Sequence, residues 1–138
     1  MRIILSVILA GAVLLTAAGH ALAHHAFAAE YDAKKRVTLQ GVVTKMEWIN
    51  PHTWLHVDVK NPEGKLEEWL VEGGPPNALF RRGLQKTALA PGTPVTIEGA
   101  RAKDGTNRIN GSYVRLDGKK LFMGSSGTGN PDEPGESK

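Results

Sequence analysis

The chain has 138 residues, with 17 Lys and Arg against 14 Asp and Glu, and it contains no cysteine. Without cysteine there can be no disulfide framework, no lipid-modified cysteine and no thiol nucleophile, so an apolar core must stabilise the fold. The net charge of +3 is too small to indicate, by itself, nucleic acid or an anionic membrane as a partner.

The first residues have the layout of a secretory signal peptide. Arg2 precedes an apolar run from 3 to 18, and Ala21-Leu22-Ala23 forms a small-x-small cleavage site. The run has 16 residues, fewer than the roughly 20 that a helix needs to cross a bilayer. We therefore predict cleavage after Ala23, export to the periplasm or the medium, and no stable membrane anchor in the mature protein.

The remaining 115 residues suit a single compact domain. We expect this domain over residues 24–123. Residues 124–138 are Gly, Ser, Pro and acidic residues without an apolar period, and we expect them to form a disordered tail.

Three strands are predicted before residue 73. Apolar residues recur at every second position from 36 to 47 and from 53 to 60, which is the period of a strand with one face toward a core. Pro51 separates these two strands, and turn residues at 61–64 predict that a third strand, 65–72, returns as a hairpin partner. Trp54 and His56 are expected on the same, outward face of the second strand.

A short helix and two or three strands are predicted in the rest of the chain. Asn77 is expected to be the N-cap of a helix over 78–82 that ends at Gly83. A fourth strand is expected to begin at Val95, a fifth to run from 108 to 116, and a short sixth from 119 to 122.

This element order is typical of an OB-type barrel. We predict an all-β fold with one short helix, arranged as a small OB-like antiparallel barrel of five to six strands. Another small antiparallel barrel or a sandwich is the alternative. Gly41 lies inside the first strand, where a bulge or sharp coil would let that strand serve both halves of a closed barrel.

Four histidines of the mature chain are candidate metal ligands: His24, His25, His52 and His56. A chain that begins at His24 offers its amine and its ring to one ion, and a ring from elsewhere can complete a flat set of three nitrogens that suits Cu(II). A second arrangement uses the amine, the next amide and the ring of His25. The predicted metal is therefore copper, while the alternative is that both terminal histidines are solvated.

If both lay on one extended strand, His52 and His56 could not share an ion, because four residues of strand separate their alpha carbons by about 13 Å. Pro51 places His52 in the loop, so His52 is the preferred third ligand. Trp48 and Trp69 are expected in the core. Trp54 is a candidate ligand-binding aromatic, as in OB folds that stack bases or sugars.

The sequence contains no Gly-x-Ser-x-Gly elbow and no phosphate-binding loop, so we expect a binding protein rather than an enzyme. Copper oxygenase activity that uses the terminal histidine is the one enzymatic alternative. The expected partner is a metal ion or a protein of the cell envelope. Nucleic acid is not expected, because few nucleic acids meet an exported protein. The oligomeric state is not predicted.

Three segments, HHAFAAEYDAKKRVTLQGVVTKMEWINPHTWLHVDV, NALFRRG and APGTPVTIEGARAKDGTNRINGSYVRLDGKKLF, resemble a family of small exported bacterial proteins, domain of unknown function 6152. The resemblance implies an exported, barrel-like domain and supplies no activity. His24 is also similar to the first residue of the histidine brace of copper monooxygenases and copper carriers. Only His24 and one further ring correspond to that brace.

Taken together, the residues predict an exported protein that binds copper through His24 with His25 or His52. The alternative is a barrel that binds another ligand or a protein through exposed aromatic residues such as Trp54.

Overall fold

A computed structural model describes residues 27–124. The predicted signal peptide, His24, His25 and most of the predicted tail lie outside these residues. The described strands are β1 (Tyr31–Glu47), β2 (Trp54–Lys60), β3 (Leu66–Glu72), β4 (Pro94–Ala102), β5 (Arg108–Leu116) and β6 (Lys119–Phe122). Residues 27–30 are helical, and the helical elements after them are α2 (Pro76–Arg81) and the short 3-10 helix η1 (Lys86–Leu89). In this part of the chain no helix is long and apolar enough to cross a membrane.

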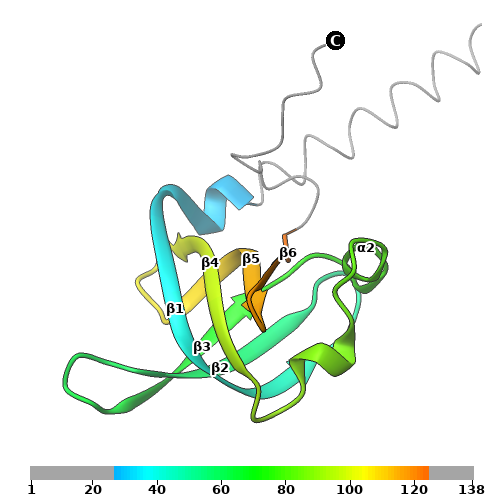
Figure 1. The fold of residues 1–138 in the computed structure, drawn as a ribbon. Coiled ribbons are helices and arrows are strands. Elements are labelled where there is room, and N and C mark those ends of the chain that lie inside the picture. Colours follow the sequence, from blue (N-terminus) through cyan, green and yellow to red (C-terminus); the bar gives the residue numbers. More distant parts are fainter. Residues whose placement is uncertain (1–26, 125–138) are drawn as a thin grey trace, which may run out of the picture.

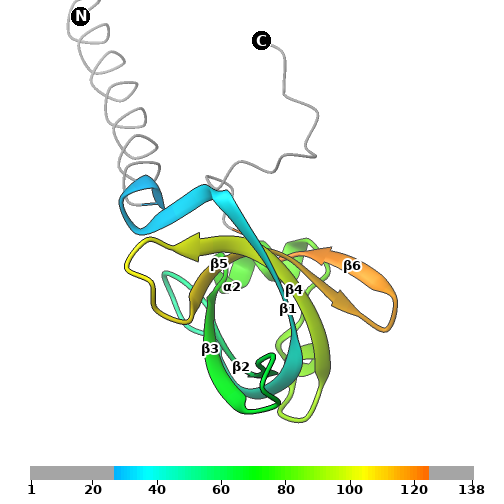
Figure 2. The same ribbon diagram turned by 90° about the vertical axis from the view of Figure 1, so that its left-hand side faces the viewer.

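The six strands form one sheet that closes into a ring. Their order is β3-β2-β1-β4-β5-β6, all neighbours are antiparallel, and a parallel pairing of β3 with β5 closes the ring. Figures 1 and 2 show β1 and β4 curving across β2 and β3, with α2 between β3 and β4 in the chain. The mostly antiparallel β fold with one short helix, and its OB-like strand order, confirm the prediction.

The long strand β1 serves both halves of the ring. Its first part pairs with β4 and its last part with β2, and Gly41 pairs with Val59 on one side and Val95 on the other. The shared role of β1 agrees with the prediction, but the register shifts lie at 32–36 and 43–45, so there is no bulge at Gly41 itself. Instead, a Cβ at Gly41 would lie 2.7 Å from Val57 Cγ1 and would overlap the Asp58 carbonyl. Gly41 therefore allows the close approach of β2 to β1.

Most element boundaries agree with the alternating pattern, with two corrections. β1 begins at Tyr31 rather than near residue 36, because the 32–36 irregularity hides the alternation there. Asn77 is not the N-cap of α2, since Pro75 occupies that position and Pro76 begins the helix. Proline suits the first helical position because its missing N–H would have no partner there.

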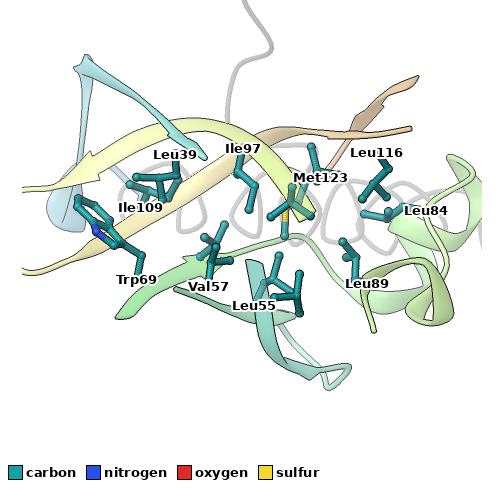
Figure 3. Close-up of a cluster of buried hydrophobic side chains, with 14 of the residues drawn as sticks. Leu39, Leu55, Val57, Trp69, Leu84, Leu89, Ile97, Ile109, Leu116 and Met123 are labelled. Carbon is teal, nitrogen blue, oxygen red and sulfur yellow. The ribbon is translucent and has the colours of Figure 1, made fainter. Parts of the chain in front are cut away.

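Apolar side chains from all the long strands fill the ring (Figure 3). Leu55, Val57, Ile97, Ile109 and Met123 are fully buried, while Leu84 and Leu89 from the α2–η1 segment lie with Leu116 at one end of the cluster. Trp69 is buried in this core and Trp48 packs against it half-buried, as predicted. The outward face of the sheet is therefore left to carry the polar side chains.

Gly41→Ala should destabilise the fold by about 1–3 kcal/mol, because the new methyl group would be forced against Val57 and the Asp58 carbonyl. Urea unfolding followed by tryptophan fluorescence measures this loss. Gln40→Ala is the matched control, since Gln40 is the exposed neighbour in the same strand and should change stability by less than about 0.5 kcal/mol. Equal stability of the two variants would contradict the account of Gly41.

Candidate functional site

The last residue of β3, Glu72, is a carboxylate with only 6% of its surface exposed. One of its oxygens accepts a hydrogen bond from the Tyr31 hydroxyl, and the other pairs with His52 Nδ1. Burying a carboxylate is unfavourable unless donors compensate for the lost water. Glu72, Tyr31 and His52 therefore form one polar cluster, which we call the Glu72 cluster.

Backbone contacts fix His52 beside this carboxylate. Thr53 follows His52 and is fully buried, and its N–H donates to the Gly74 carbonyl (3.2 Å) while its carbonyl accepts from Gly73 N–H (2.9 Å). A Cβ at Gly73 would overlap Thr53 Oγ1, so the pairing depends on glycine there. The loop before β2 is thus tied to the end of β3.

The pairing with Glu72 determines which ring nitrogen of His52 is available. A carboxylate only accepts hydrogen bonds, so His52 Nδ1 must carry the proton, and in a neutral ring Nε2 then keeps its lone pair. The His52 side chain is 42% exposed, so a ligand can reach it. A carboxylate on the far nitrogen is the usual arrangement behind a histidine that binds a metal.

Tyr31 stays a hydrogen-bond donor in this cluster. Burial, and then the hydrogen bond to the Glu72 carboxylate, raise the pKa of the Tyr31 hydroxyl far above its ordinary value. The Arg108 guanidinium lies 5.4 Å from the Tyr31 ring centre. The hydroxyl is therefore protonated throughout the neutral range.

Two buried polar atoms of the described residues lack a hydrogen-bond partner, and both belong to β5 beside the Glu72 cluster. They are Arg108 Nε and Asn110 Oδ1. Asn110 is opposite Glu72 in the parallel β3–β5 pairing, and Arg108 lies over Tyr31. Unsatisfied buried groups are rare in folded proteins and often mark sites that await a ligand or water.

The described chain begins against the same cluster. The Phe27 ring stacks on Tyr31 with centroids 5.7 Å apart, and Glu30 is held by a hydrogen bond from Lys103 N–H to its carbonyl (2.9 Å). Glu30 also pairs with Arg108. The beginning of the described chain therefore lies beside Tyr31.

His56 lies in a different environment on the outer face of β2. Its Nδ1 is 3.1 Å from a Glu68 oxygen and its Nε2 is 3.4 Å from a Glu47 oxygen. The hydrogen bond from Lys45 is the main cause of the lowered pKa of Glu47, which keeps that carboxylate ionised. Both neighbouring acids come from adjacent strands, Glu47 from β1 and Glu68 from β3.

The two described candidate ligands therefore do not share a partner. Among residues 27–124 no group of three or more His, Asp or Glu side chains is placed to hold a metal ion. Trp54 is half-buried and lies opposite Glu72 in the β2–β3 register, which brings it to the same face as the Glu72 cluster.

Sequence reasoning missed Glu72, Tyr31 and Asn110. One feature of the sequence does indicate that Glu72 is buried: this charged residue directly follows the apolar Trp69–Val71 and precedes two glycines. Such a carboxylate at the buried end of a strand requires partners.

Tyr31→Phe should lower stability by about 1.5–3 kcal/mol near neutral pH, because Glu72 would lose a donor. In the unfolded chain the hydroxyl ionises near pH 10, while the folded protein keeps it protonated. The extra stability of the wild type is thus complete below about pH 10 and falls by about 1.4 kcal/mol per unit above it. Urea unfolding of the wild type and the variant, with chelator and over a range of pH, measures the difference in their free energies of unfolding. A difference that stays constant above pH 10 would contradict this account of Tyr31.

Comparison with known proteins gives a family but no activity. No curated protein and no solved structure matches the chain. Residues 12–111 match the model of a family of unknown function (DUF6152). The match includes every residue of the Glu72 cluster, together with His24, His25 and His56. Because it covers more than half of the chain, the protein belongs to the family of unknown function DUF6152.

Proposed function

We propose that the processed protein binds Cu(II) in the periplasm or outside the cell, through the amine and ring of His24 and the Nε2 of His52. One observation carries this proposal. Phe27 stacks on Tyr31, and Tyr31 donates to the same carboxylate that pairs with His52. The first described residue and His52 thus contact the same cluster, which supports a ligand set drawn from His24 and His52.

The distance along the chain is compatible with this ligand set. Cleavage after Ala23 would leave His24 three residues before Phe27. Three residues span at most about 10 Å, and the long histidine side chain adds to that reach. This reach is measured from Phe27, whose ring contacts Tyr31 of the Glu72 cluster.

The donors suit the metal. A terminal amine has a pKa of about 7.7–8.0, so Cu(II) can displace its proton near neutral pH. Two imidazole nitrogens and an amine form a flat nitrogen set of the kind that Cu(II) prefers. His25 is the alternative source of a ring. Glu72 would not bind the ion in this arrangement but would orient His52 and increase its basicity.

A second function uses the same face. Trp54 lies beside Glu72, and Asn110 Oδ1 and Arg108 Nε lack partners there. An uncharged ligand, or a segment of an envelope protein, could stack on Trp54 and bond to these groups. Quenching of tryptophan fluorescence by such a ligand in the presence of chelator would favour this function over copper binding.

His52→Ala should weaken copper binding by about 100-fold or more, because it removes a ligand, and Glu72→Gln should weaken it by about 10- to 100-fold through the orientation of His52. Competition titrations of the processed, untagged protein against a chelator measure both affinities. His56→Ala is the matched control, since His56 pairs with Glu47 and Glu68 instead, and it should leave the affinity unchanged. An equal loss in the His52 and His56 variants would contradict the proposed ligand set.

A further inference from the structure

A long segment of the domain contains no acidic residue. From Gly73 to Ile97 the chain has Arg81, Arg82 and Lys86 but neither Asp nor Glu. This segment includes α2 and η1. The acidic residues of the described chain instead lie mainly on β1, β2, β3 and their connections. The small net charge thus conceals an uneven distribution of charge along the fold.

The helix α2 presents this charge to solvent. Pro76 and Leu79 are buried, so the opposite side of the helix is exposed. The Phe80 side chain lies on that exposed side and is 62% accessible. Arg81 and Arg82 follow it and are exposed, and Arg81 Nε donates to the Asn77 carbonyl along the helix (3.2 Å).

The β5–β6 hairpin extends the same surface. The Arg82 guanidinium stacks on the Phe122 ring of β6 at 4.1 Å, which joins α2 to the hairpin. Lys120 is exposed on β6 two residues before Phe122, and side chains two residues apart lie on the same face of a strand. Lys120 also lies over the Tyr113 ring (4.0 Å) and pairs with Glu98 (3.4 Å), and the pairing offsets part of its charge. We call this surface the basic face, made up of Phe80, Arg81, Arg82 and Lys120.

We propose that the basic face docks the protein reversibly on an anionic phospholipid membrane, with Phe80 inserted among the head groups and Arg81, Arg82 and Lys120 over their phosphates. An exposed aromatic ring beside arginine and lysine is the pattern of interfacial membrane binding. Anionic lipids attract basic residues near the surface. Phe80 is the one strongly exposed aromatic ring of the described chain, and cations surround it. Charge complementarity therefore favours a bilayer.

Sedimentation of the full processed chain with vesicles tests this proposal. The protein should sediment with vesicles that contain phosphatidylglycerol and stay in solution with pure phosphatidylcholine, and added salt should release it. Arg81→Gln with Arg82→Gln should reduce the partition coefficient by about 25-fold, at about five-fold per charge. Phe80→Ser should also reduce the partition coefficient, but binding should still depend on salt because the cations remain.

Two matched variants serve as controls. Leu66→Ser removes an apolar side chain that is also 62% exposed but lies on β3, and Lys34→Gln with Lys35→Gln removes two exposed charges from β1. Neither should change binding by as much. Circular dichroism checks that every variant is folded. If the double arginine variant does not fold, the variant Phe80→Ser with Arg81→Gln is used in its place. Failure to bind anionic vesicles, equal binding to neutral vesicles, or equal losses in the controls would overturn the proposal.

Discussion

The buried carboxylate of Glu72 is the constraint on which the outer face of this fold depends. It lies at the end of β3, where β3 also pairs with β5 and closes the ring of strands. A carboxylate in that position requires donors, and Tyr31 and His52 provide them from the beginning of β1 and the loop before β2. Three distant segments are thereby held together. The same contacts leave one nitrogen of His52 facing solvent with its lone pair.

The fold followed from local patterns where those patterns were regular. Residues 108–116 and 119–122 were predicted as strands and are β5 and β6 with the same bounds, because turn residues delimit them. The beginning of β1 was missed, since its register shifts between Asp32 and Arg36 and the side chains there are mostly polar. The contact that requires glycine at position 41 was not predicted, because the close approach of β2 is a tertiary contact.

The candidate site could be predicted only in part. Pro51 indicated that His52 lies in a loop, and the structure places it before β2. Its partners could not be predicted, because Tyr31 and Glu72 are 41 residues apart and meet only after the ring closes. For the same reason, the pairing of His56 with Glu47 and Glu68 depends on the register of three strands. Local spacing contains no information about either contact.

The central claim is that copper binds beside His52, on the nitrogen that faces away from Glu72. Anomalous diffraction at the copper edge, from crystals of the processed protein loaded with Cu(II), tests this most directly. The account predicts one strong anomalous peak within bonding distance of His52 Nε2, with the terminal amine and ring of His24 completing the set. A peak at His56, or no ordered peak in a copper-saturated crystal, would contradict it.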